Sequence, residues 1–526
     1  MNAIIMAAGT SSRFTPLSYE VPKGLLKVKG EILIERQIRQ LQEAGISDII
    51  IVVGYMAEKL MYLKDKFNVR IVYNEDYNRY NNTSSIMRVV EELGDTYICS
   101  SDNYFPINVF QEKSKKGFYS ALYTEESTNE YCITVDHDDN IIDVKVGGNN
   151  AWYMVGHVFF DMEFSKEFRE ILKKEYDKTE TKLGYWEDLY IKHIKDLPPL
   201  KIHRYKPHDI EEFDTLDELR LFDDTYIKYT GCQVLLNICA TLKCEESDIH
   251  DIIVLNQGMT NSSFVFTCKK NHQKYVYRHP GIGTESLINR ENELFSLQVA
   301  KEYGFDETFI YMHPTDGWKI SHYIENAETL NNNTIQLHEN LDKIATIYHS
   351  LHNSGVVLKQ KFDIFQEIDK YEKVIEEIGA TMYKGWEGVY HHIMDLKTKF
   401  EIVDNNLCPC HNDAVAANFI KDEKGKLYLI DWEYAGMNDP MADFAALFLE
   451  NDFSTDNKNY ILIKYFNGVI PNRTNDRILS FQILWDYLWS QWTIIKESKG
   501  DDFGSYGEDR FNRCVTNLEK LKRIVI

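Results

Sequence analysis

Short apolar runs and amphipathic stretches alternate through the first part of the chain. Apolar runs of strand length occupy residues 2–8, 47–54, 69–74 and 95–102, and stretches with helical spacing occupy residues 31–45, 58–67 and 84–94. Strand–helix alternation of this kind predicts a mostly parallel sheet in an α/β fold. Ligands bind such sheets at the carboxyl ends of the strands, so polar residues that directly follow these strands are candidate site residues.

The pattern changes beyond residue 228. Residues 252–270 and 274–281 are typical of antiparallel strands joined by turns, whereas the chain from about residue 336 onward has mainly helical spacing. A small sheet lobe before a larger helical lobe is the order of a kinase-like α+β domain. A chain of 526 residues is too long for one compact core, which indicates at least two domains. The predicted domains are residues 1–228 and 229–526.

Composition narrows the class of protein. A net charge of −23 disfavours nucleic-acid binding, because the phosphates would be repelled. No apolar run approaches the roughly 20 residues of a membrane helix, and the N-terminus lacks signal-peptide features, so we expect a cytoplasmic protein without membrane insertion. The nine cysteines include no CxxC pair. Cys408 and Cys410 form a CPC sequence with no second ligand cluster, and we interpret them as reduced thiols rather than zinc ligands.

Two polar motifs in the second domain suggest phosphoryl-transfer chemistry. CHNDAVAANFI, at residues 410–420, places an aspartate and an asparagine five positions apart, and LYLID, at 427–431, ends an apolar strand with another acid. Phosphoryl transfer uses a carboxylate near the alcohol and amide and carboxylate oxygens around Mg²⁺. Asp413 fits the first role, and Asn418 and Asp431 fit the second. An isolated His-x-Asp is usually an ordinary turn, but this combination predicts a phosphotransferase.

These motifs resemble the choline kinase and aminoglycoside phosphotransferase group, whose catalytic loop reads H-x-D-x4-N before a strand that ends in I-D. The resemblance covers about residues 230–526 and implies a bilobal protein-kinase-like α+β domain. It implies that Arg278 neutralises the ATP phosphates with Glu291 as its partner, and that a hinge near Ser321–Ile324 holds adenine. The ATP-binding residues implied are Gly258, Thr260, Asn261, Arg278, Glu291, Ser321 and Tyr323. Arg278 stands where protein kinases have lysine and GxGxxG is absent, so Arg278 and Glu291 could also be a surface ion pair.

An aromatic segment near the C-terminus bears on the substrate. Trp485, Trp489 and Trp492 fall at i, i+4 and i+7, so they share one helix face. A quaternary ammonium cannot donate hydrogen bonds and is best held by aromatic faces near a carboxylate. The choline-binding residues that the resemblance implies are Trp489, Trp485, Phe503 and Glu450. An aromatic stripe at helical spacing is also typical of a packed core, and this alternative stays open.

The start of the chain offers a second candidate site. IIMAAGTSSRF places a Gly/Ser-rich turn, Ala8, Gly9, Thr10 and Ser11, directly after the first predicted strand. Such a turn presents backbone N–H groups to phosphates, and Arg13 and Lys23 follow it as cations for a triphosphate. The turn is neither a Walker A motif, because GK[ST] is missing, nor a Rossmann fingerprint, which needs GxGxxG.

This stretch resembles the AAGxGSR and PK signature of nucleotide-sugar and phosphocholine nucleotidyltransferases, with Ser11 in place of the usual second glycine. The resemblance covers about residues 1–225 and implies a Rossmann-like α/β nucleotidyltransferase domain. It implies that CTP is bound by Asn82, Ser84 and Ser85, and Mg²⁺ by Asp102 and Asp214. Candidates for binding the phosphocholine acceptor are Trp152, Trp186, Glu187, Asp188 and Glu211. The WED sequence among them is also an ordinary helix start.

The two resemblances explain each other, because a choline kinase makes the phosphocholine that a cytidylyltransferase converts to CDP-choline. Together they imply a bifunctional enzyme that uses ATP, CTP and Mg²⁺ and binds choline and phosphocholine. One alternative is the same pair of reactions on ethanolamine or another amino alcohol. Further alternatives are a sugar nucleotidyltransferase fused to a sugar or aminoglycoside kinase, and a regulatory nucleotide-binding protein. The regulatory protein would have an inactive kinase half, which the intact Asp413, Asn418 and Asp431 disfavour.

Overall fold

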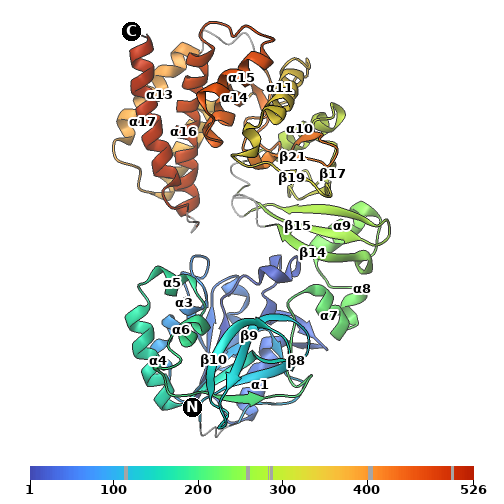
Figure 1. Cartoon of the computed structure of the whole chain (residues 1–526), viewed down its shortest axis with the longest axis vertical. Coiled ribbons are helices and arrows are strands. Elements are labelled where there is room, and N and C mark those ends of the chain that lie inside the picture. The colour runs from blue at the N-terminus through green and yellow to red at the C-terminus, as the bar shows by residue number, and fades with distance from the viewer. Residues whose placement is uncertain are drawn as a thin grey trace. The chain divides into compact units, whose positions relative to one another are not determined.

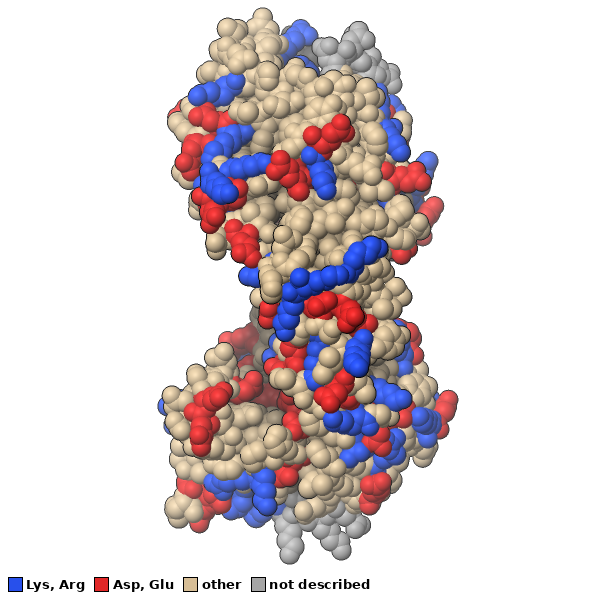
Figure 2. Space-filling model, turned by 90° about the vertical axis from the view of Figure 1, so that its right-hand side faces the viewer, with Lys and Arg blue, Asp and Glu red and all other residues tan. Residues whose placement is uncertain are grey.

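The computed structural model of the chain contains two compact units, Met1–Val254 and Leu255–Ile526 (Figure 1). It describes residues 1–111, 116–255, 261–281, 284, 288–400, 407–498, 501 and 503–525, with backbone alone at 398–400 and 523–525. The division into units follows compactness, and the domain boundary after residue 228 stays a prediction. Acidic and basic side chains are interspersed over the face shown in Figure 2.

A nine-stranded sheet forms the centre of the N-terminal unit. Its strands are β1 (Asn2–Ala7), β4 (Ile49–Val53), β5 (Arg70–Tyr73), β6 (Thr96–Ser100), β8 (Phe118–Thr124), β9 (Thr128–Val135), β10 (Ile141–Gly148), β11 (Ala151–Phe160) and β12 (Lys201–Arg204). β1 pairs in parallel with both β4 and β6, and β5 pairs in parallel with β4, which confirms the predicted α/β sheet. β11 pairs antiparallel with β6, β8 and β9, so antiparallel strands extend the parallel part.

Helices pack on both faces of this sheet. The helices of the unit are α1 (Leu33–Glu43), α2 (Tyr62–Phe67), α3 (Asn82–Arg88), α4 (Met162–Glu175), α5 (Thr179–Leu183), α6 (Trp186–Lys192), α7 (Leu216–Phe222), α8 (Thr225–Lys228) and α9 (Gln233–Leu242). Successive side chains of β1 point to opposite faces. Ile4 belongs to the core that includes residues of α3, α4 and α6, whereas Ile5 belongs to the core that includes residues of α1. Burial on both faces explains the continuous apolar runs of these strands.

Short strands connect this sheet to the rest of the unit. β2 (Lys27–Val28) pairs with β3 (Glu31–Ile32), and β7 (Asn103–Tyr104) pairs with β13 (Glu211–Glu212). The second pair brings the segment after residue 204 back to the loop that follows β6. All but the last residue of strand β14 (Ile249–Leu255) belongs to the unit, which ends at Val254.

Polar contacts hold the segment from α7 to β14 together and join it to the rest of the unit. Arg220 of α7 is buried, and its guanidinium donates to the backbone carbonyls of Tyr226, Glu246 and Ile249. The Glu20 carboxylate accepts hydrogen bonds from the Val234 N–H at 3.0 Å and from the thiol of Cys232 at 3.3 Å. These contacts explain why residues beyond 228 belong to the N-terminal unit by compactness.

The C-terminal unit begins with a small antiparallel sheet. Its strands β15 (Ser262–Cys268), β16 (Gln273–His279), β18 (Lys319–His322) and β17 (Phe309–Met312) lie in this order, with α10 (Arg290–Glu302) between β16 and β17 in sequence. Two further small sheets contain β19 (Glu328–Thr329), β21 (Phe419–Lys421) and β22 (Leu427–Leu429), and β20 (Cys408–Cys410) with β23 (Gly436–Asn438). The predicted order of a sheet lobe before a helical lobe is confirmed.

Long helices make up most of the C-terminal unit. They are α11 (His338–His352), α12 (Ile364–Ile378), α13 (Trp386–Phe400), α14 (Pro440–Glu450), α15 (Thr455–Tyr465), α16 (Thr474–Ser498) and α17 (Tyr506–Val525). Helix α16 is buried along most of its length because α12, α14 and α17 pack against it. A helix enclosed in this way carries apolar residues on every face. Across the residues that the structure describes, we find no helix with the length and apolar character needed to cross a bilayer.

Replacing Arg220 by methionine tests how the α7–β14 segment is held. We expect the free energy of unfolding of the N-terminal unit to fall by about 2–3 kcal/mol, because buried carbonyls lose a charged donor. Urea titration monitored by far-ultraviolet circular dichroism measures this. Arg220→Lys keeps the positive charge but has fewer hydrogen-bond donors, so the free energy of unfolding should fall by less than in Arg220→Met. An Arg220→Met protein with an unchanged unfolding midpoint would contradict this account.

Candidate active sites

A cavity of about 920 Å³ opens at the carboxyl ends of β1 and β6 in the N-terminal unit. The turn after β1 forms part of its wall, and Ser11 in this turn has φ 52°, a left-handed conformation that residues other than glycine rarely adopt. The predicted site residues on the wall are Ala8, Gly9, Thr10, Ser11, Arg13, Lys23, Asn82, Ser85, Asp102, Glu187 and Asp214. The cavity therefore lies where ligands bind α/β sheets.

Arg13, Lys23, Asp102 and Asp214 form one charged cluster in this cavity. Lys23 Nζ lies 2.8 Å from Asp102 Oδ2 and 3.8 Å from Asp214 Oδ1. Arg13 Nη1 lies 2.7 Å from Asp214 Oδ2. Burial opposes the charge on Lys23, but the neighbouring Asp102 carboxylate outweighs it and holds the pKa of Lys23 above its ordinary value. Two cations suit a triphosphate, and two converging carboxylates suit a hard divalent metal.

Other acidic and aromatic side chains line the same cavity. Burial raises the pKa of Glu187 to about 7, and its carboxylate accepts hydrogen bonds from Asn82 Nδ2 and the Tyr119 hydroxyl, both at 3.3 Å. Burial, together with the charge of Asp102, raises the pKa of Glu212 to about 7. Tyr131 and Tyr185 also line the cavity. A cationic ligand would find both carboxyls and aromatic rings here.

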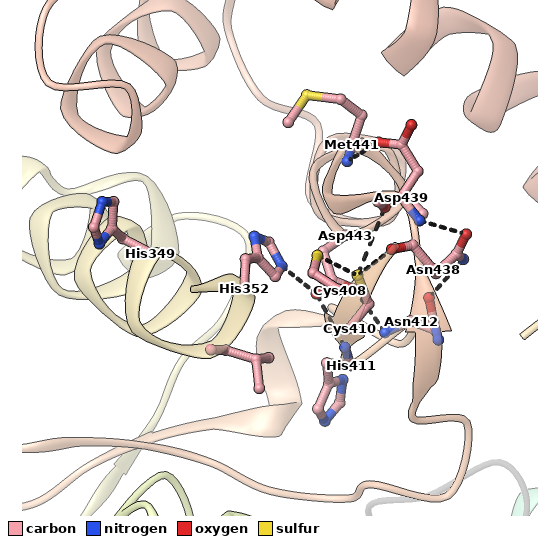
Figure 3. A network of polar contacts seen from close by, with 12 residues as sticks. His349, His352, Cys408, Cys410, His411, Asn412, Asn438, Asp439, Met441 and Asp443 are labelled. Atoms are coloured by element: carbon pink, nitrogen blue, oxygen red, sulfur yellow. Dashed lines mark hydrogen bonds and ion pairs between the residues drawn. The ribbon is translucent and has the colours of Figure 1, made fainter. Parts of the chain in front are cut away.

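In the C-terminal unit, Asp443 holds the loop that follows β20 (Figure 3). Its carboxylate, on α14, accepts hydrogen bonds from the backbone N–H groups of His411 at 3.0 Å and Asn412 at 2.6 Å. It also contacts His352 Nε2 of α11 at 3.1 Å. Burial opposes its ionisation, but the contacts with His352 and His411 hold the pKa of Asp443 below its ordinary value. The loop is thus fixed by a buried, ionised carboxylate.

Asp413 and Asn418 meet on this loop. Asn418 Nδ2 donates to the Asp413 carbonyl at 2.9 Å and to Asp413 Oδ2 at 3.1 Å. Burial raises the pKa of Asp413 well above its ordinary value, and the negative charges of Asp431 and Glu433 add to this effect. A carboxylate with a raised pKa is a stronger proton acceptor, as a general base requires.

Asp431 follows β22 with φ 67° and faces two cations. Arg278 Nη1 donates to Asp431 Oδ1 at 3.2 Å, and Lys319 Nζ lies 3.8 Å from the same oxygen. Burial opposes ionisation here too, but Lys319 and Arg278 hold the pKa of Asp431 below its ordinary value. Arg278 Nη2 also lies 2.5 Å from Glu293 Oε1.

The acidic residues around Arg278 offer a metal-binding set. Carboxylate oxygens of Glu293, Asp431 and Glu433 lie within 4.8 Å of one another. Burial, with the charge of Asp431, raises the pKa of Glu433 to about 7. Asn261 Nδ2 donates to Glu433 Oε2 at 3.1 Å, which links the start of β15 to this group. Oxygen ligands of this kind fit a hard divalent cation beside nucleotide phosphates.

An aromatic surface lies near the loop that follows β20. Trp489 of α16 is half-buried, and its ring is perpendicular to that of Tyr434, with 5.3 Å between the ring centroids. The pKa of Tyr434 is raised by burial and by the charges of acidic neighbours that include Asp413, so this ring lies near the predicted base. Phe503 packs on Trp492 at 5.0 Å between centroids.

Two family models match the chain, and they match different parts of it. Residues 3–105 match the MobA-like NTP transferase domain, and residues 252–479 match the choline/ethanolamine kinase family. The chain is 34% identical over 224 residues to choline-phosphate cytidylyltransferase of Streptococcus pneumoniae, a match that covers 43% of this chain and 97% of that protein. It is 31% identical over 258 residues to protein LicA of Haemophilus influenzae, covering 47% of this chain and 95% of that protein. The chain belongs to the choline-phosphate cytidylyltransferase family and to the choline/ethanolamine kinase family.

A further relative of the cytidylyltransferase unit differs in its substrate. The chain is 34% identical over 230 residues to 2-aminoethylphosphonate cytidylyltransferase of Lancefieldella rimae, and the match covers 43% of this chain and 93% of that protein. The nucleotidyltransferase and kinase classes predicted from the sequence are both confirmed.

Several residues predicted for the acceptor lie away from the cytidylyltransferase cavity. Trp186 begins α6 and points into the core, where it stacks on Tyr119 at 5.9 Å between centroids. Trp152 lies on β11, and the Arg204 guanidinium covers its ring at 5.4 Å. These tryptophans therefore pack within the unit. Among the described residues predicted for the acceptor, Glu187 is the one on the cavity wall.

Three more predicted residues have structural contacts in the cytidylyltransferase unit. Asp188 accepts from the Tyr185 N–H at 2.9 Å, which caps α6, and from the Tyr131 hydroxyl at 2.8 Å. Glu211 pairs with the exposed His208 at 2.7 Å. Ser84 is buried behind the wall, where its hydroxyl accepts from Asn74 Nδ2 at 2.9 Å.

In the kinase unit the partner of Arg278 is Glu293 rather than Glu291. Glu291 lies exposed in the first turn of α10, whereas Glu293 is buried on the face toward Arg278. Ser321 lies on β18 beside Val276 of β16, and Tyr323 is exposed just after this strand. Gly258 and Thr260 lie outside the described residues.

The predicted choline residues of the kinase unit fall into two groups. Trp489 and Phe503 are half-buried and keep part of their surface exposed. Trp485 is fully buried, and its Nε1 donates to the Ala442 carbonyl at 3.2 Å, so it belongs to the core. Glu450 is paired with Arg510, which also contacts Asp486.

Four site residues were missed by the sequence reasoning: Glu212, Glu293, Lys319 and Tyr434. A signal for Glu212 existed, because alternate strand residues face the same side and Glu212 is two residues before Asp214. Glu293 could have been chosen over Glu291 by its place on the helix face. Lys319 follows no recognisable motif, since its position depends on the pairing of β18 with β16.

The raised pKa of Glu187 predicts a pH-dependent loss of stability. Its folded pKa of about 7 exceeds the ordinary value of 4.5, so its contribution to stability is complete below pH 4.5 and is lost as the pH rises through 7. Relative to Glu187→Gln, the wild-type protein should lose at most about 3 kcal/mol over this range. Chemical denaturation across the range measures the difference.

The control is Glu170→Gln, which changes an exposed carboxylate on α4. Its pH dependence should follow that of the wild type. If Glu187→Gln also follows the wild type, the pKa of Glu187 is not raised in the folded protein.

Proposed function

We propose that the kinase unit phosphorylates choline with ATP and that the cytidylyltransferase unit converts phosphocholine and CTP into CDP-choline and pyrophosphate. The observation that carries this proposal is the half-exposed ring of Trp489, which meets Tyr434 near Asp413. Such a surface attracts a quaternary ammonium through the ring faces and requires no hydrogen bond from it. An ammonium held there would bring the hydroxyl end of choline toward the predicted base.

The chemistry of the kinase unit follows from the contacts around Asp413. The choline hydroxyl oxygen attacks the γ-phosphorus of ATP, the bond from this phosphorus to the β–γ bridging oxygen breaks, and ADP leaves. The hydroxyl proton passes to Asp413, which Asn418 orients through its hydrogen bond to Oδ2. Arg278 and Lys319 supply positive charge for the phosphates. A divalent metal, which we propose is Mg²⁺ held by Asn418 and Asp431, would neutralise further phosphate charge.

The cytidylyltransferase unit uses its charged cluster differently. A phosphate oxygen of phosphocholine attacks the α-phosphorus of CTP, and pyrophosphate leaves. Arg13 and Lys23 stabilise the charge that develops on the phosphates, and the turn after β1 offers backbone N–H groups to them. We propose that Mg²⁺ is held by Asp102 and Asp214, where it would draw electron density from the phosphate oxygens.

A second candidate function takes a primary amine in place of the trimethylated one. Glu130, Glu187 and the hydroxyl groups of Tyr131 and Tyr185 line the cytidylyltransferase cavity and can accept hydrogen bonds from an ammonium. The similarity to 2-aminoethylphosphonate cytidylyltransferase, and a kinase family that includes ethanolamine kinases, favour testing it. Comparing kcat/KM for choline with ethanolamine, and for phosphocholine with 2-aminoethylphosphonate, separates the two. Higher values for the primary amines would replace our proposal.

Asp413→Asn should slow choline phosphorylation by about 10²–10⁴-fold, because the proton acceptor is lost. The same protein should still form CDP-choline from added phosphocholine and CTP. Lys23→Ala is the reciprocal variant and should lose CDP-choline formation while it still phosphorylates choline. Mass spectrometry of products with ATP, CTP and Mg²⁺ measures both reactions. Loss of both reactions in either variant would contradict two separate active sites.

Trp489→Ala should raise the KM for choline by about 3- to 30-fold, since a cation–π contact contributes about 0.5–2 kcal/mol. The KM for ATP should change little. Trp489→Phe keeps an aromatic face and should lie between the wild type and Trp489→Ala. A choline KM that is equal in all three proteins would exclude Trp489 from the ammonium site.

A further inference from the structure

A second group of metal-ligating side chains lies in the kinase unit behind the catalytic loop (Figure 3). A ring nitrogen of His352 and the sulfur atoms of Cys408 and Cys410 all lie within 4.8 Å of one another. His352 ends helix α11, and the two cysteines lie on strand β20. Residues far apart in the sequence thus bring together one imidazole and two thiols.

The spacing of the two thiols suits a tetrahedral metal. Residues i and i+2 of a strand point to the same side, which brings the Cys408 and Cys410 sulfurs to 3.7 Å. A tetrahedral zinc ion with Zn–S bonds of about 2.3 Å places its sulfur ligands about 3.7 Å apart. Pairing of β20 with β23 holds both cysteines in this register, with Cys408 opposite Asn438 and Cys410 opposite Gly436.

The surroundings of the thiols favour a cation. The sulfur of Cys410 is 3.6 Å from each of the backbone carbonyl oxygens of Asn438 and Asp439, and the Asp443 carboxylate contacts His352 next to it. Negative and partly negative oxygens that disfavour a bare thiolate would stabilise a divalent ion bound to it.

We propose that His352, Cys408 and Cys410 form a binding site for a thiophilic divalent cation of the Zn²⁺ class. Each ion that binds displaces the two thiol protons to solvent, forms two metal–sulfur bonds and takes one ring nitrogen of His352. Both ring nitrogens have partners, Nδ1 the Tyr465 hydroxyl at 2.9 Å and Nε2 the Asp443 carboxylate at 3.1 Å. The ring nitrogen that binds the ion loses its present partner. The other ring nitrogen keeps its partner, and this contact orients the ring. A water can take the fourth position.

This site differs in chemistry from the metal sites that serve the phosphates. Thiolate and imidazole ligands select soft or borderline ions, whereas the carboxylates around Arg278 select hard ones such as Mg²⁺. The described residues form two groups of possible metal ligands. One is His352 with Cys408 and Cys410, and the other is Glu293 with Asp431 and Glu433.

The site has a direct connection to the catalytic loop. Strand β20 continues into His411 and Asn412, whose backbone N–H groups are held by Asp443, and Asp443 is held in turn by His352. An ion that joins His352 to β20 therefore acts on the same contacts that fix Asp413. We expect a bound ion to slow phosphorylation and to leave cytidylyl transfer unchanged.

Cobalt titration of the full chain tests the site, because Co²⁺ bound by thiolates gives a charge-transfer absorption in the near ultraviolet. We expect one Co²⁺ per chain with this absorption, and its loss when Zn²⁺ is added. Cys408→Ser and Cys410→Ser should each abolish the band. Cys408 is half-buried with Cys410 as its described partner, so Cys408→Ser should keep the basal kinase activity. Cys244→Ser, which removes a half-buried thiol of the other unit, is the matched control and should keep the band.

Absence of the band in the wild-type chain, or its persistence in Cys408→Ser, would overturn the proposal. A second measurement follows choline phosphorylation with added Zn²⁺ at a fixed excess of Mg²⁺. Inhibition should occur in the wild type and be at least several-fold weaker in Cys408→Ser. Equal inhibition of the two proteins would contradict a connection between this site and the catalytic loop, and would leave the proposed kinase function untouched.

Discussion

Both units depend on one constraint, which is that a buried charge must be paired. Lys23 is buried against Asp102, and Arg278 is buried against Glu293 and Asp431. Unpaired burial of any of these groups would cost several kcal/mol, so the pairs hold the sites in shape without a nucleotide. The same cations are the ones that phosphates need, and the same carboxylates are the ones that a divalent metal needs. Nucleotide and metal binding can therefore replace one set of partners by another without exposing a bare charge.

The kinase loop adds a second requirement, because its backbone takes conformations that other residues must fix. Asn412 has φ 65° and Asp431 has φ 67°, both in the left-handed region. Asn and Asp tolerate this region better than most residues, but the strain still has to be offset by surrounding contacts. Asp443 provides those contacts at Asn412, and its own charge is stabilised by His352. A buried histidine–aspartate pair on two helices thus fixes the loop that carries Asp413, the predicted base.

The sequence predicted residues that belong to motifs, but it did not predict which of two nearby side chains faces a site. Asp413, Asn418 and Asp431, and the Arg13, Lys23, Asp102 and Asp214 cluster, were predicted because each follows a clear strand or belongs to a motif with fixed spacing. Errors arose where a choice of one or two residues decides which way a side chain points. Glu291 and Glu293 differ by two helix positions, and Glu211 and Glu212 by one strand position, yet the second member of each pair faces the site. Trp186 was chosen for its ring, but a ring at a helix start packs inward when the sheet below is apolar.

The cysteines show that a group of side chains from distant parts of the chain is not visible in the sequence. Cys408 and Cys410 lacked a second ligand cluster in the sequence, and the structure supplies His352 from a helix that precedes them by more than fifty residues. No periodicity links a helix end to a distant strand, since their contact depends on how α11 packs on β20. Local spacing predicts groups that one element carries, whereas groups shared by two elements become visible only through packing.

The carboxyl groups with pKa values near 7 connect these electrostatics to substrate choice. Glu187 and Glu212 in one unit and Glu433 in the other share this value, and in each case burial is the main cause. A carboxyl group poised in this way ionises when a cation arrives, because the cation offsets the cost of desolvating the charge. Binding of an ammonium near Glu187 would then release a proton, and binding would tighten as the pH rises toward 7. A neutral sugar ligand would release no proton there, so the state of these carboxyls itself distinguishes a cationic acceptor from a neutral one.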